Sequence, residues 1–87
     1  AEGDFISREL ILIKVHCPAA KRGEILTTVE LMQGKIVDFS TTSVTVEYCE
    51  CSSRVDTVVE LLKPYGIREI VRTGTVALDK GATAVSV

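Results

Sequence analysis

Three cysteines and one histidine are the residues of this 87-residue chain that could bind a metal or take part in redox chemistry. Cys49 and Cys51 lie two residues apart in a strand-forming segment, so their Cα atoms are expected about 6.5 Å apart on one face. A disulfide there would lie at the strained limit of the usual range. Cys17 and His16 are expected at the other end of the sheet, too far away to complete a zinc site. We therefore expect ordinary strand cysteines, with no metal site and no cofactor within one chain; ligands shared between two copies remain open.

Two other places could support catalysis or anion binding. His16 could act as a general base or pH switch, but the sequence identifies no serine or aspartate partner, which favours a strand-end histidine in contact with solvent. The stretch Lys21-Arg-Gly-Glu24 could hold an anion where a helix begins; a single glycine is a weak signal, and a solvated loop is the preferred interpretation. We predict no catalytic residues.

Arg68 and Arg72 lie inside a strand-forming segment that is followed by a polar break at Thr73-Gly74 and a second short extended run. The period of two in a strand places both arginines on one face, together with Ile70. Two interpretations are equally favoured. The arginines contact a partner, or they form a cross-strand ion network with the first strand, for instance with Glu9.

The composition indicates a single globular domain. Apolar residues make up 46% of the chain and charged residues 25%, which argues against disorder. A net charge of −2 and a pI near 5.3 provide no electrostatic footprint for nucleic acid or an anionic membrane. No apolar run approaches the roughly 20 residues that a bilayer span needs. A start at Ala1 favours a domain cut from a longer protein.

Periodicity predicts six elements in the order strand, helix, strand, strand, helix, strand. Gly34 is expected to end the first helix, and Ser53-Arg-Val-Asp56 has the form of a capping box for the second. We expect one ACT-like domain over 1–87, with its core at about 8–78, a flexible lead-in at 1–7 and a flexible tail beyond Asp79. The expected elements are strands at 8–17, 35–40, 44–50 and from 67, and helices at 24–33 and from 53 to Pro64.

This order predicts an α+β fold, the ferredoxin-like (ACT-like) βαββαβ sandwich. Its four-stranded antiparallel sheet has the strand order 4-1-3-2, with two helices on one face. The first strand carries Ile11, Ile13 and Val15 on one side and Leu10 and Leu12 on the other. Because both sides of this strand are apolar, we expect the bare face of the sheet to be covered by a partner.

Three segments, Arg8–Val15, Gly34–Asp38 and Gly66–Leu78, resemble the C-terminal domain of the small regulatory subunit of acetolactate (acetohydroxyacid) synthase. The resemblance implies a non-enzymatic subunit that binds and activates the thiamine-diphosphate-dependent catalytic subunit. It also implies a role in feedback regulation of branched-chain amino-acid synthesis by valine, leucine or isoleucine, in the bacterial cytoplasm or the plastid stroma. An effector-binding ACT domain would precede this one in the whole protein.

Arg72, Thr73 and Gly74 match the family pattern, and with Arg68 they are the residues expected at a partner interface. We also expect a homodimer through the open sheet face, with no nucleic acid and no membrane as partner. The alternative is a stand-alone ACT-like domain that senses an amino acid at a dimer interface.

Overall fold

The computed structural model describes residues 5–79 of the chain. Residues 1–4 and the tail beyond Asp79, for which flexibility was predicted, lie outside this described range. The elements, in chain order, are β1 (Phe5–His16), the short 3-10 turn η1 (Ala19–Lys21), α1 (Arg22–Leu31), β2 (Lys35–Phe39), β3 (Ser43–Glu50), α2 (Ser52–Leu62), the 3-10 turn η2 (Lys63–Tyr65), β4 (Ile67–Arg72) and β5 (Val76–Asp79).

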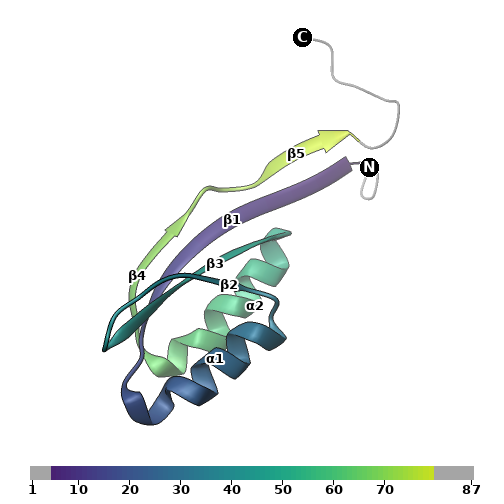
Figure 1. The fold of residues 1–87 in the computed structure, drawn as a ribbon. Coiled ribbons are helices and arrows are strands. Elements are labelled where there is room, and N and C mark those ends of the chain that lie inside the picture. Colours follow the sequence, from purple (N-terminus) through teal and green to yellow (C-terminus); the bar gives the residue numbers. More distant parts are fainter. Residues whose placement is uncertain (1–4, 80–87) are drawn as a thin grey trace.

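The sheet has the predicted order β2-β3-β1-β4, and its strands pair antiparallel. Both helices cover the same face of this sheet (Figure 1). The predicted ferredoxin-like architecture is therefore confirmed. Neither described helix has the length and apolarity that a membrane crossing requires.

A fifth strand extends the sheet beyond its helix-covered part. β5 pairs with the start of β1, from Phe5↔Asp79 to Arg8↔Val76, whereas the pairing of β1 with β3 begins only at Glu9. Residues 5–8 and 76–79 therefore form a two-stranded ribbon, here called the β1–β5 arm, which projects past the helices (Figure 1). The lead-in predicted for 1–7 is wrong for residues 5–7, because the extended run after Thr73-Gly74 supplies a pairing strand.

The core lies between the helices and one face of the sheet. In β1 the odd-numbered residues face the helices, and Ile11, Ile13 and Val15 have no exposed surface. Their neighbours on β3 continue this layer, and the apolar stripes of the two helices close it, as the helical spacing predicts. These neighbours are Val44, Val46 and Tyr48 on β3, Ile25 and Val29 on α1, and Val55, Val58 and Leu62 on α2.

The second helix begins without the predicted capping box. Its N-terminal cap is Cys51, and no side chain caps it by a hydrogen bond. The hydroxyl of Ser53 lies 3.4 Å from the Cys51 sulfur, and the carboxylate of Asp56 accepts a hydrogen bond from Arg72 at 2.8 Å. The box does not form because the helix begins at Ser52, so Ser53 already lies inside its first turn, and Asp56 is bound by Arg72.

The first helix ends at Leu31, and the left-handed residue expected at Gly34 is found one position earlier, at Gln33. Gln33 has a φ of +63°, the left-handed conformation that usually selects glycine. The amide of Gly34 then donates to the carbonyl of Val29 at 3.0 Å, which closes the helix end. A Cβ on Gly34 would meet Val46 Cγ1 at 3.1 Å and Val29 Cγ1 at 3.3 Å. Glycine is therefore needed at 34 for close packing, and Gln33 takes the strained backbone.

Candidate partner-binding face

The sheet face away from the helices exposes apolar side chains along β1, β4 and β5, with Arg8 of β1 as a charged interruption opposite Val76. The even-numbered residues of β1 lie on this face, and the registers Ile6↔Leu78 and Leu12↔Val71 place their partners beside them. We call the resulting set the open apolar strip. It consists of Ile6, Leu12, Val71, Val76 and Leu78, which are 44%, 36%, 57%, 64% and 67% exposed.

One end of the strip carries a shallow hollow of about 170 Å³. Lys14 and Glu69 border it and form an ion pair with an N–O distance of 3.1 Å. Both side chains are substantially exposed, so the pair adds little to stability. The pair neutralises these two charges, which lowers the electrostatic cost of covering them, while Glu47 of β3 remains beside Leu12 on this face.

Arg72 lies on the opposite, helix-covered side of the sheet. It pairs across the ladder with Ile11, whose side chain is buried. Its guanidinium donates to both carboxylate oxygens of Glu9, at 3.0 and 2.5 Å, and to Asp56 at 2.8 Å. The interpretation of an ion network with Glu9 is confirmed for Arg72 but not for Arg68, whose guanidinium lies beside His16. A contact between Arg72 and a partner stays a prediction.

Among the residues that the structure describes, Glu9 is the charged side chain buried in the core, with 4% of its surface exposed. The Arg72 guanidinium is the main reason why the pKa of Glu9 lies below its ordinary value. The Ser52 hydroxyl and the Gly74 amide lower this pKa further, while desolvation of the carboxylate raises it. Hydrogen bonds from Arg72 to Glu9 and then Asp56 raise the pKa of the guanidinium in turn. The network therefore joins β1, β4, α2 and the break before β5.

Thr73 and Gly74 form the break between β4 and β5. The Thr73 amide donates to the Leu10 carbonyl at 3.0 Å, and the Thr73 hydroxyl accepts from the Leu10 amide at 3.1 Å. Gly74 follows with a φ of +82°, and the hydroxyls of Ser52 and Thr75 are 2.6 Å apart. These residues keep β1 hydrogen-bonded through the break, and they thereby fix the start of the β1–β5 arm.

Arg68 lies at an irregularity near the other end of β4. The register shifts between Lys14 and Val15, so that Arg68 is an extra residue of β4 and interrupts the predicted alternation. Its guanidinium lies 2.7 Å from Nδ1 of His16. The structure therefore places Arg68 far along β4 from the ion network of Arg72, and it brings only Arg72, Thr73 and Gly74 together.

All three cysteines are free thiols. Cys17 is buried, and Cys49 is exposed in β3 opposite Leu10. Cys51 lies just past β3, at the start of α2, where the Ser53 hydroxyl chiefly lowers the pKa of its thiol. Within residues 5–79 there is no group of three or more side chains arranged to hold a metal ion.

Comparison with known proteins agrees with this geometry. The family model described as the small subunit of acetolactate synthase matches residues 8–81. The acetolactate synthase small subunit of Mycolicibacterium smegmatis is 40% identical over 84 residues, which cover 97% of this chain and 49% of that protein. The small subunit of Aquifex aeolicus is 43% identical over 76 residues, which cover 86% of this chain and 40% of that protein.

A solved structure gives the same result. The crystal structure of the small subunit from Thermotoga maritima matches with a TM-score of 0.85 at 33% identity, and the match covers 94% of this chain and 50% of that one. This chain thus spans about half the length of the relatives it matches. On the family model and these relatives together, the chain belongs to the family of acetolactate synthase small subunits.

Proposed function

We propose that this chain is a regulatory domain that binds and activates the catalytic subunit of acetolactate synthase. The reaction and its thiamine diphosphate belong to the catalytic subunit, and this domain contributes no catalytic residue. The observation that carries the proposal is the family match over residues 8–81. A role in feedback regulation by valine, leucine or isoleucine follows from the same family membership.

Two copies of the domain associate through the open apolar strip. The strip supports this because five large apolar side chains lie exposed on one face, and exposed sets of this kind mark interaction surfaces. A two-fold dimer places the same strip on both partners, so apolar surface meets apolar surface. The neutral Lys14–Glu69 pair at the end of the strip introduces no uncompensated charge into such an interface.

Arg72, Thr73 and Gly74 influence partner binding by positioning the β1–β5 arm. This is supported by their contacts, since Arg72 is bound to Glu9 and Asp56 and Thr73 is bound to Leu10. Arg68 is exposed at the edge of the sheet, beside His16. It is the member of the predicted set whose side chain is best placed to touch a partner directly.

Titration of the chain into purified catalytic subunit tests the main proposal. We expect saturable binding by calorimetry and a rise in the rate of acetolactate formation. Absence of both binding and activation would refute it. In parallel, valine, leucine and isoleucine are titrated into the chain alone. Clear binding of one of them to the isolated domain would favour the stand-alone sensor over the regulatory subunit.

A further inference from the structure

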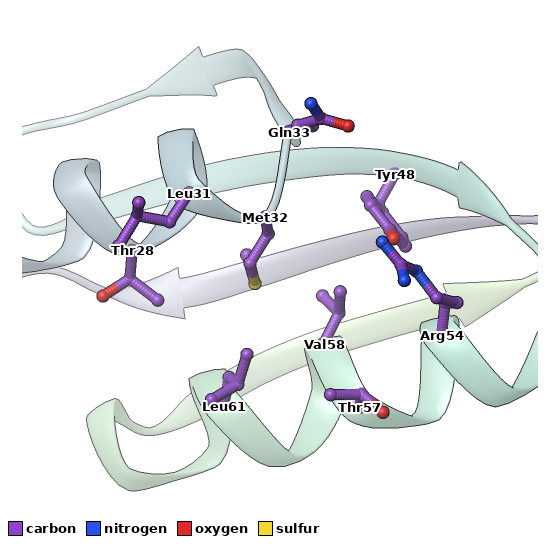
Figure 2. A pocket seen from close by; sticks show the side chains of 9 residues that line it. All are labelled: Thr28, Leu31, Met32, Gln33, Tyr48, Arg54, Thr57, Val58 and Leu61. Carbon is purple, nitrogen blue, oxygen red and sulfur yellow. The ribbon is translucent and has the colours of Figure 1, made fainter.

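A groove of about 660 Å³ runs between the two helices, on the side of the molecule opposite the open apolar strip. It exists because α1 ends at Leu31 and the chain then reverses through Gln33 and Gly34. The end of α1 therefore stops short of Tyr48 on β3, which lines the groove although only 7% of its surface is exposed. Figure 2 shows Met32 at the end of α1, Val58 on α2 facing it, and Tyr48 beyond the last turn of α1.

The groove is apolar on both rims and offers few hydrogen-bonding groups along its sides. Leu31 of α1 is 80% exposed and Leu61 of α2 is 48% exposed. Thr28 and Thr57 also line it, but their hydroxyls donate to carbonyls of their own helices, those of Glu24 and Ser53, at 2.9 and 3.1 Å. Because both hydroxyls are occupied, Thr28 and Thr57 offer the groove a surface that is suited to aliphatic side chains.

Arg54 is the charged residue among the described groove lining. Its guanidinium lies beside the Tyr48 ring at one end of the groove (Figure 2), and the Tyr48 phenol is the main cause that raises the pKa of Arg54. Among the side chains of residues 6–78, no carboxylate forms an ion pair with Arg54. The charge of Glu50 contributes to raising the pKa of Arg54, and its carboxylate accepts a hydrogen bond from the Cys51 amide at 2.9 Å. An anionic group on an occupant would therefore find a cation here with free N–H donors.

We propose that this groove binds an acidic amphipathic helix of a partner protein. The groove residues of α2, from Arg54 to Leu61, lie at i, i+3, i+4 and i+7, which corresponds to two helical turns or about 10 Å. A helix with two aliphatic residues one turn apart and a carboxylate a further turn along matches the leucine rims and Arg54. A small ligand would leave Leu31 largely exposed, whereas a helix laid along the groove covers both rims.

This inference does not rest on the function proposed above, because the groove and the open apolar strip lie on opposite sides of the molecule. The probe is a capped, fluorescein-labelled alanine-glutamine peptide of about 16 residues, a length at which isolated helices begin to form. It carries two leucines one turn apart and one glutamate a turn further. A second peptide has lysine in place of the glutamate. Binding to the whole 87-residue chain is measured by fluorescence anisotropy.

We expect the acidic peptide to bind, and the lysine peptide to bind about tenfold more weakly, since a hydrogen bond to a charged group is lost. Arg54→Gln and Leu31→Ser should each weaken binding of the acidic peptide by a similar factor. Lys63→Gln is the matched control, because it removes a cation at the end of α2 outside the groove. Both Arg54 and Leu31 are exposed, so circular dichroism melts should match those of the unsubstituted chain.

Two results would overturn the proposal. The first is peptide binding that is absent, or equal for the Arg54→Gln and Lys63→Gln variants. The second comes from decanoate, a small amphiphilic carboxylate titrated in parallel. Decanoate binding that depends on Arg54, without peptide binding, would make the groove a small-molecule site.

Discussion

Val71→Thr tests whether the open apolar strip mediates self-association. Val71 lies opposite Leu12 and is 57% exposed. Full burial of a valine side chain contributes about 1.5–3 kcal/mol, so covering the exposed part of Val71 contributes about 0.9–1.7 kcal/mol. A two-fold dimer contains this residue twice, which doubles the figure to about 1.7–3.4 kcal/mol. Threonine keeps the shape and strand propensity of valine but replaces one of its two γ-methyl groups with a hydroxyl. About half of this contribution is then lost, so dimer dissociation constants should rise roughly four- to twenty-fold.

Sedimentation equilibrium over a range of protein concentrations measures this change. Leu26→Gln is the control, because Leu26 is 41% exposed on α1, in the helix layer that a dimer through the strip leaves uncovered. We expect its dissociation constant to be unchanged. An unsubstituted chain that stays monomeric at the highest concentration would refute the reasoning. So would a Val71→Thr variant that associates as tightly as the Leu26→Gln variant.

Three further predictions concern stability. Glu9→Gln should lower the midpoint of urea unfolding. Because the pKa of Glu9 is lowered in the folded state, the carboxylate stabilises the fold fully above its ordinary pKa of about 4.3. This stabilisation is lost as the pH falls through the lowered pKa. Unfolding curves of both proteins should therefore converge toward low pH, and a constant gap would contradict this account. Gly34→Ala should destabilise by about 1–3 kcal/mol, because the added methyl group meets Val46 and Val29 in the core; unchanged urea midpoints would show that the valines move aside. Gln33→Gly should stabilise by roughly 0.5 kcal/mol, since glycine relieves the positive φ but adds freedom to the unfolded chain; a loss of stability in the same assay would disprove this.

Periodicity was sufficient to predict the sheet order and the two helix stripes. The spacing of Val55, Val58, Val59 and Leu62 identified the core side of α2, whereas Ile11, Ile13 and Val15 were placed on one face of β1 without a decision on which face is the core. These patterns succeed because burial of one face is the main force that selects an element and its orientation.

The sequence could not identify the ends of the elements or the groove. Glu9 looks like a surface residue, yet it falls on the odd, inward side of β1 and is buried because Arg72, 63 positions later, neutralises it. The sequence indicated this burial in one way: Glu9, like Ile11, is an odd-numbered residue of β1, and in a strand such residues share one face. The chain reversal through Gln33 after α1 depends on the space that Val46 leaves at Gly34, and the groove beside Arg54 depends in turn on that reversal. Such features are determined by distant packing partners, which local propensity does not contain.

The alternation in β1 raises a problem of register. Leu10 and Leu12 are nearly as apolar as Ile11 and Ile13, so a slip of one residue would exchange one set for the other at little hydrophobic cost. The charged neighbours distinguish the two arrangements: slippage would turn Lys14 inward, away from Glu69, and would separate Glu9 from Arg72. The ion pairs of Glu9 and Lys14, at the two ends of the segment 9–14, thus determine the register of β1. They disfavour the shifted sheet that the leucines and isoleucines alone would allow.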